Sequence, residues 1–160
     1  MSLVPKHIKN LKPYVAGKSI EELQREKNIS KIIKLASNEN PLGPSSLAIA
    51  EAGKVLSDCH RYPDSSGYKL RVALADKFDL NINNVIIGPG SEGIMSNIMR
   101  TFLRANDEIL TSENSFIGFR VLANASGYKC NWIPMENDKY DLKKIGESIN
   151  SNTKIIYLAN

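Results

Sequence analysis

Residues 85–103 read VIIGPGSEGIMSNIMRTFL, which is an apolar run, a glycine-rich turn and an amphipathic segment in succession. The run 85–87 predicts a strand buried on both faces, and the glycines and proline after it end that strand. Apolar residues recur every three to four positions over 90–103, which predicts a helix with one stripe lying on a sheet. We therefore expect a strand, a tight turn and a helix from an α/β protein.

The first turn of this expected helix has the properties of an anion site. Backbone N–H groups near Ser91, Glu92 and Gly93 have no partner inside a helix that starts here, and they lie at the positive end of its dipole. A helix start that follows a glycine turn is typical of phosphate binding. The sequence thus predicts a phosphate site at this turn.

Two interpretations of the turn stay open from these residues alone. Residues 88–93, GPGSEG, match the G-x-G-x-x-G pattern of dinucleotide-binding folds, and Glu113 stands where a ribose-binding carboxylate is expected. This pattern predicts an NAD-dependent oxidoreductase that uses Gly88, Gly90 and Gly93. A glycine turn before a helix also occurs as a plain connection that binds no ligand.

Composition excludes several classes of protein. The chain has 160 residues, of which 42% are hydrophobic, and a formal net charge of +4 with scattered lysines. It is long enough for one globular core and shows no basic stripe for nucleic acid. No apolar run approaches the roughly 18 residues of a membrane span, and the N-terminus lacks the apolar core of a secretion signal. The two cysteines and two histidines offer neither a C-x-x-C pair nor a metal cluster. We expect a cytoplasmic protein that binds no metal, nucleic acid or membrane.

Periodicity and punctuation predict the other elements. An arm leads to a short helix that begins with the capping box Ser19-x-x-Glu22, Gly127 fits a helix C-cap and Asp141 an N-cap. We expect strands at 32–35, 109–110, 128–133 and 154–159, and helices at 45–56, 68–78, 116–126 and 142–149. Strands that alternate with helices predict a mostly parallel sheet with right-handed crossovers.

Ligands of parallel sheets bind at the carboxyl ends of the strands, which places three segments at one edge. These segments are the turn 88–92, residues 112–116 and Asn160. Phe116 opens the helix after the second strand, where it could stack on a flat ring or belong to the core with Phe119. The spacing does not separate these alternatives.

Two loops in the first half present candidate ligand groups. Residues 36–44, ASNENPLGP, are rich in side chains that bond to backbone, so an Asx-type turn explains them as well as a ligand site does. Tyr62 precedes a proline, which keeps it out of helical geometry and projects its ring from a loop. An aromatic hydroxyl fixed on a loop is a candidate ligand group.

Three motifs stand in an order that resembles a known family. They are KLASNENPLGP at 34–44, RYPD at 61–64 with GYKLR at 67–71, and GSE at 90–92. Together they resemble the histidinol-phosphate aminotransferases, which are pyridoxal-phosphate enzymes of the aspartate aminotransferase fold. The resemblance covers essentially the whole chain, and it replaces the NAD interpretation, which leaves the 84 residues before Val85 without a role.

The resemblance implies a three-layer α/β/α fold with a mostly parallel sheet. Residues 35–160 would form the N-terminal part of the domain that binds pyridoxal 5'-phosphate, after an arm and the start of a small domain at 1–34. Gly90, Ser91 and Glu92 would hold the cofactor phosphate, with the N–H groups of the last two as donors. Phe116 would stack on the pyridine ring.

The resemblance also implies a second subunit and a substrate contact. Tyr62 would donate its hydroxyl to the phosphate of the neighbouring subunit's cofactor, which requires at least a homodimer. Asn38, Glu39 and Asn40 would lie by the substrate, a small phosphorylated amine.

The sequence departs from the family pattern at two motifs. Members commonly have Asn-Gly-Ser-Asp at the phosphate turn, where this chain has Pro89-Gly90-Ser91-Glu92, and many place Pro-x-Tyr where this chain has Asn114-Ser115-Phe116. Backbone contacts survive the first change, and the second keeps the ring but loses its hydroxyl. In the family the Schiff-base Lys lies beyond the position of Asn160. We therefore expect no catalytic residue among these residues and no activity from this chain alone.

The activity implied by the resemblance is transamination of histidinol phosphate with 2-oxoglutarate, giving imidazole-acetol phosphate and glutamate in histidine biosynthesis. Relatives that act on aromatic amino acids or decarboxylate threonine phosphate share these motifs and stay open as alternatives. An NAD-dependent oxidoreductase and a non-catalytic interaction fragment are more distant alternatives.

Overall fold

The computed structural model describes residues 2–12 and 14–159. Contacts within the chain divide it into two compact units. Unit 1 comprises Met1–Tyr14 and Ile87–Asn160, and unit 2 comprises Val15–Ile86.

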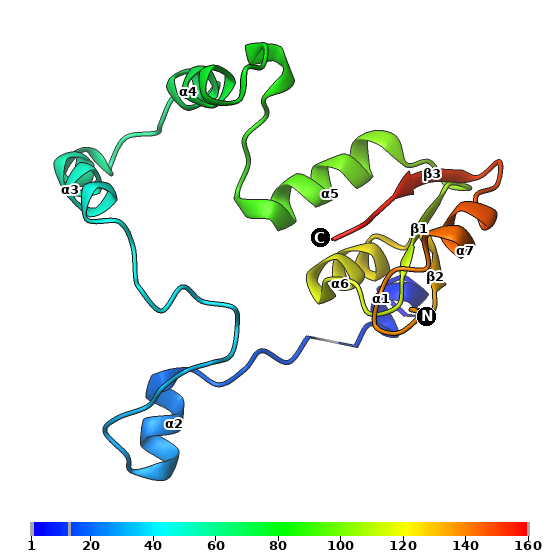
Figure 1. Ribbon diagram of the computed structural model, residues 1–160, viewed down its shortest axis with the longest axis horizontal. Coiled ribbons are helices and arrows are strands. Elements are labelled where there is room, and N and C mark those ends of the chain that lie inside the picture. The colour runs from blue at the N-terminus through cyan, green and yellow to red at the C-terminus, as the bar shows by residue number, and fades with distance from the viewer. Residues whose placement is uncertain (1, 13, 160) are drawn as a thin grey trace. The chain divides into compact units, whose positions relative to one another are not determined.

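Unit 1 is built on a sheet of three parallel strands in the order β2–β1–β3 (Figure 1). The strands are β1 (Glu108–Ser112), β2 (Lys129–Ile133) and β3 (Thr153–Ile156). Every residue of the central strand β1 is buried, as expected for a parallel strand with neighbours on both sides and helices on both faces. The predicted parallel sheet is confirmed.

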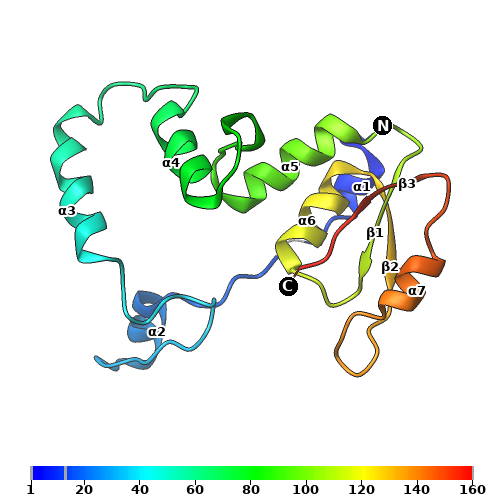
Figure 2. The same cartoon turned by 45° about the horizontal axis from the view of Figure 1, so that its top comes forward.

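Helices cover both faces of this sheet, which gives three layers (Figure 2). α5 (Gly90–Phe102) and α6 (Ile117–Ser126) share one face, and α7 (Leu142–Glu147) covers the other. Ile109 and Leu110 point to opposite faces because a strand has a period of two. One buried cluster contains Met99, Leu103, Ile109, Phe119 and Ala123, and the other contains Leu110, Ile133 and Ile145. The predicted α/β/α fold is confirmed in unit 1.

The Phe119 ring joins helix and sheet on the first face. It is 3% exposed and stacks on the ring of Tyr157, with 3.6 Å between centroids and 3° between planes. Tyr157 directly follows β3, and its carbonyl accepts a hydrogen bond of 2.7 Å from Thr111 Oγ1. The stack therefore ties α6 to the carboxyl end of the sheet.

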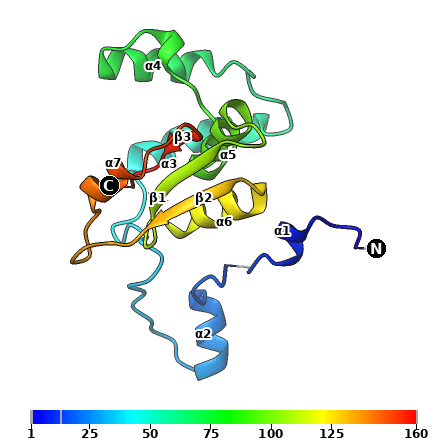
Figure 3. The same cartoon turned by 90° about the vertical axis from the view of Figure 1, so that its right-hand side faces the viewer.

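A short helix that the sequence pattern did not predict, α1 (Lys6–Lys9), lies beside α6 (Figure 3). Four residues are too few to show a helical period. The predicted C-cap Gly127 ends α6 with a φ of +74°. A Cβ on Gly127 would also lie 2.8 Å from Cε1 of His7, so the glycine permits both the turn and the approach of α1.

Unit 2 consists of helices joined by loops. Its helices are α2 (Ile20–Lys27), α3 (Ser46–Val55) and α4 (Tyr68–Phe78), with 3-10 turns at Leu56–Asp58 and Ile82–Asn84. Ser19 Oγ accepts a hydrogen bond of 3.1 Å from the Glu22 N–H, as its predicted N-cap role requires. Among the described residues of this unit, the buried side chains are Ala75 and Val85. The Arg71 guanidinium fixes the end of the unit by donating to the carbonyls of Ile82 and Val85, each at 2.8 Å.

Two predicted strands are wrong. Residues 32–35 and 85–87 are not in strands, and the strands of the described sheet pair with one another. Leu35 is 93% exposed and Ile86 70% exposed, so these apolar runs lack the covering layers that a buried strand needs. An apolar run favours a strand, but hydrogen bonds to a neighbouring strand are what form it.

Candidate functional site

The glycine turn opens α5 as the sequence predicts. Gly90 has a φ of +72°, which side-chain-bearing residues rarely adopt, and open space lies where its Cβ would be. Its N–H donates to the Gly88 carbonyl at 2.8 Å, which tightens the turn. No side chain of the described residues caps α5, so the N–H groups of Ser91 and Glu92 stand at an uncapped helix start. This start can accept an anion.

The other two glycines of the turn are explained by packing. A Cβ on Gly88 would lie 2.7 Å from Cδ1 of Ile94, and one on Gly93 would lie 2.6 Å from Cγ of Pro89. The dinucleotide interpretation also needs a paired strand before the turn, and residues 85–87 do not form one. Glu113 lines a separate hollow of about 410 Å³, whose lining is Glu113, Asn114, Arg120, Asn124 and Trp132. The pattern G-x-G-x-x-G is therefore accounted for without a dinucleotide.

Phe116 lies against the start of α5. Its Cε1 and Cζ atoms lie 2.6 and 2.8 Å from the position that a Cβ on Gly118 would take, and Glu92 Oε1 lies 2.8 Å from the same position. The first turns of α5 and α6 therefore meet at Gly118. Phe116 is 46% exposed, whereas Phe119 is buried, so the core alternative for Phe116 is wrong. Its stacking on a cofactor stays a prediction.

Ser115 lies in the segment 112–116 that the sequence places at this edge, but the sequence pattern assigns it no role of its own. Its Oγ is buried and has no hydrogen-bond partner among the described residues. Leaving a buried hydroxyl unpaired costs about 1–3 kcal/mol. An unpaired hydroxyl directly before Phe116 therefore supports a polar ligand at this edge. The sequence could not have identified Ser115 as a candidate, because no sequence pattern shows that a hydroxyl is buried without a partner.

The third segment expected at this edge is the chain after β3. Tyr157 belongs to this segment. The pKa of its phenol is raised, mainly by burial and to a smaller extent by the nearby Tyr140. Asn160 lies outside the described residues.

The predicted substrate residues belong to unit 2, and one of them, Asn40, forms an Asx turn. Asn40 Oδ1 accepts from the Leu42 N–H at 3.1 Å, and its Nδ2 donates to the Gly43 carbonyl at 3.0 Å. Asn38 has a φ of +50°, and the Glu39 carboxylate pairs with Lys34 Nζ at 2.6 Å. The turn alternative is thus confirmed, and the substrate role stays a prediction.

Tyr62 also belongs to unit 2, and its side chain is fully exposed on its loop. The loop is fixed by Asp64, whose carboxylate accepts from the N–H groups of Tyr68 and Ser66 at 3.0 and 2.9 Å. These bonds hold the pKa of Asp64 below its usual range. The expected projection of Tyr62 from a loop is confirmed, and its contact with a second subunit stays a prediction.

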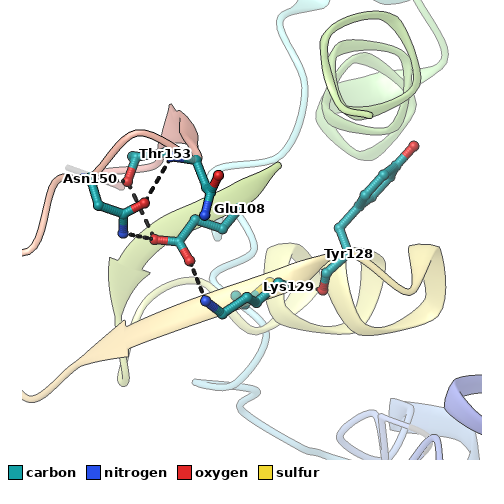
Figure 4. Close-up of polar contacts among 7 residues, drawn as sticks. Glu108, Tyr128, Lys129, Asn150 and Thr153 are labelled. Atoms are coloured by element: carbon teal, nitrogen blue, oxygen red, sulfur yellow. Dashed lines mark hydrogen bonds and ion pairs between the residues drawn. The ribbon is translucent and has the colours of Figure 1, made fainter. Parts of the chain in front are cut away.

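A polar cluster lies at the opposite edge of the sheet, where the three strands begin (Figure 4). Glu108, only 1% exposed, pairs with Lys129 Nζ at 2.8 Å and accepts hydrogen bonds from Asn150 Nδ2 and, at 3.3 Å, Thr153 Oγ1. The hydrogen bond from Lys129, followed by that from Asn150, lowers the pKa of Glu108. Each strand contributes its first residue, so the cluster locks the strand starts together.

Replacing Glu108 with glutamine is expected to cost about 1.5–3 kcal/mol at neutral pH, the value of hydrogen bonds to a charged group. The ordinary pKa is 4.5 and the folded-state pKa is lower, so the stabilisation is complete above pH 4.5 and is lost as pH falls through the folded value. Urea unfolding of wild type and Glu108→Gln at a series of pH values measures this difference.

Glu147→Gln is the control, because Glu147 is 65% exposed in its 4.0 Å pair with Lys143 and contributes at most about 0.5 kcal/mol. A wild-type advantage over Glu108→Gln that did not change between pH 7 and pH 3 would contradict the assigned role of the charge.

Among residues 2–12 and 14–159, no helix has both the length and the apolar character needed to cross a membrane. No group of three His, Cys, Asp or Glu side chains within the same ranges is placed to hold a metal ion.

No protein-family model matches the sequence. The chain is 42% identical to a histidinol-phosphate aminotransferase of Anaeromyxobacter sp. (strain Fw109-5), in an alignment that covers 100% of this chain and 44% of that protein. It thus spans less than half the length of the curated relatives that it matches.

Two solved structures share the fold. Histidinol-phosphate aminotransferase from Sinorhizobium meliloti in complex with pyridoxal-5'-phosphate matches with a TM-score of 0.76 and 23% identity, covering 91% of this chain and 38% of that chain. Aspartate aminotransferase from Thermotoga maritima matches with a TM-score of 0.77 and 18% identity, covering 96% and 44%. Over the part of their length that it spans, the chain is similar in sequence to histidinol-phosphate aminotransferases, and it shares its fold with the solved aminotransferases.

Proposed function

We propose that the full-length protein containing this chain is a cytoplasmic aminotransferase that uses pyridoxal 5'-phosphate and acts on histidinol phosphate. The observation that carries the proposal is the meeting of an uncapped helix start at Ser91 and Glu92 with the ring of Phe116. The identity of 42% to a histidinol-phosphate aminotransferase supports the choice of substrate.

The residues present fit this coenzyme. The uncapped start of α5 suits a phosphate, because its N–H groups and dipole favour a dianion. The half-exposed Phe116 ring offers a flat apolar face to a pyridine ring, and open space lies over Gly90. The unpaired Ser115 hydroxyl adds a polar group beside them.

In this proposal the described residues bind the coenzyme and orient its ring. The N–H groups of Ser91 and Glu92 donate to the phosphate, and Phe116 covers one ring face and excludes water from it. When bound, the coenzyme supplies an electron-accepting ring that stabilises negative charge on the substrate carbon next to the amino group. The residues of 35–160 would form part of the domain that holds the coenzyme, and the Lys that anchors it would follow them in the chain.

A second subunit would complete the site. Tyr62, fully exposed on its loop, would donate its hydroxyl to the phosphate held by the neighbouring subunit, so the active protein would be a homodimer. Asn38, Glu39 and Asn40 would lie by the substrate.

Incubation of the full-length protein with pyridoxal 5'-phosphate, histidinol phosphate and 2-oxoglutarate is expected to form glutamate, since the amino group moves to the keto acid. The readouts are glutamate formation and the absorption change of the coenzyme on binding. Aromatic amino acids, followed by glutamate formation, and threonine phosphate, followed by release of carbon dioxide, are the comparison substrates, and faster turnover of either would assign that relative's activity. A folded protein that leaves the coenzyme's absorption unchanged would contradict the proposal.

A further inference from the structure

We propose that Gly118 is a positioning residue, whose missing side chain lets the Phe116 ring and the Glu92 carboxylate share the first turn of α6. This inference rests on the proposed function, because the ring is assigned there to the coenzyme. It assigns a task to a residue outside all three sequence motifs.

The space at Gly118 is already filled by two other residues. A Cβ there would lie 2.6 Å from Cε1 and 2.8 Å from Cζ of Phe116, and 2.8 Å from Oε1 of Glu92. Distances under 3.0 Å essentially never occur for a real Cβ, so a side chain at 118 requires these groups to move. The Phe116 ring is rigid and turns about only two side-chain bonds, so it yields less easily than a long, flexible side chain does.

Conformational freedom does not explain this glycine. Gly118 does not have the positive φ that Gly90 and Gly127 have, and it lies within a helix, where alanine is the more stabilising residue. The close approach of Phe116 and Glu92 is therefore the reason for glycine at this position.

The contact joins both halves of the proposed coenzyme site. The backbone of Glu92 belongs to the phosphate turn, and its carboxylate lies at the first turn of α6, where a helix dipole favours negative charge. Phe116 immediately precedes that turn. Gly118 thus sets the distance between the phosphate donors and the ring-stacking face.

Gly118→Ala in the full-length protein is expected to raise the Kd for pyridoxal 5'-phosphate about threefold to tenfold, the change produced by loss of one aromatic contact. Gly146→Ala is the matched control, because Gly146 also lies in a helix and has nothing within 4 Å of its Cβ position. The Kd comes from absorbance titration, and circular dichroism of the bound coenzyme reports its orientation, which a merely structural role would not alter.

A double-mutant cycle with Phe116→Leu tests whether Gly118 acts through the ring. Once the ring is removed, Gly118→Ala is expected to change the Kd little further, so the two effects are not additive. If Gly118→Ala alone does not fold, the double variant decides: recovered folding supports the ring clash, and continued unfolding overturns it.

The outcomes separate this inference from the proposed function. No binding by the wild-type protein overturns the proposed function and this inference with it. Binding by the wild type, with equal Kd values and equal circular dichroism for Gly118→Ala and Gly146→Ala, overturns the role of Gly118 alone.

Discussion

Phe119→Ala is expected to lower the free energy of unfolding by about 3–5 kcal/mol, which is the usual cost of removing a buried phenylalanine ring. Phe119 is 3% exposed and packs with Met99 and Ile109 in the core of unit 1. Its ring also stacks on Tyr157, so alanine removes both the packing of α6 on the sheet and the tie to the segment after β3. Urea unfolding of the full-length protein measures the loss.

Phe119→Leu is the control for this prediction. Leucine keeps most of the volume and loses only the planar stack, so its expected cost is well below that of alanine. Equal unfolding midpoints for Phe119→Ala and the wild type would show that this face of the sheet is not a tightly packed core.

Ser91→Pro is expected to weaken binding of pyridoxal 5'-phosphate about 10- to 100-fold. Proline removes the N–H that is proposed to donate to the phosphate, and a hydrogen bond to a charged group contributes about 1.5–3 kcal/mol, with tenfold in Kd for each 1.4 kcal/mol. The helix tolerates proline in its first turn, since that N–H has no partner inside the helix.

Two variants isolate the backbone donor in that experiment. Ser91→Ala keeps the N–H and removes the hydroxyl, and Ser46→Pro makes the same replacement at the first residue of α3. Both are expected to bind the coenzyme like the wild type. If Ser91→Pro also matched the wild type in an absorbance titration, the phosphate would have to be bound elsewhere.

Elements with a clear period or cap were predictable from the sequence. The bounds of α4 agree with the predicted 68–78, and Gly127 and Asp141 end and begin their helices as expected, because φ preference and capping are local properties. The strand predicted at 85–87 is wrong because a strand forms only when a neighbouring strand bonds to it, and an apolar run does not specify that neighbour. Alternation of elements sufficed to predict the parallel sheet.

The candidate site was predictable in part for the same reason. The helix start at Ser91 and Glu92 follows from a local turn, and the position of Phe116 at the same edge follows from the parallel topology. The approach of Phe116 to Gly118 and the unpaired hydroxyl of Ser115 depend on packing across elements, which spacing along the chain does not encode. The roles of Tyr62 and Asn38 depend on a second subunit and a substrate, so they stay predictions.

In unit 1 the residues that hold the sheet together and the residues proposed to face a ligand lie at opposite ends of the parallel strands. Glu108 and its partners bind the strand starts, while the segment 113–116 that leads to Phe116 lies past the strand ends. Because residues 113–116 make none of the contacts of Glu108, changes in that segment are expected to leave the Glu108 cluster intact. Such a layout lets evolution diversify what the protein recognises while the scaffold stays constant.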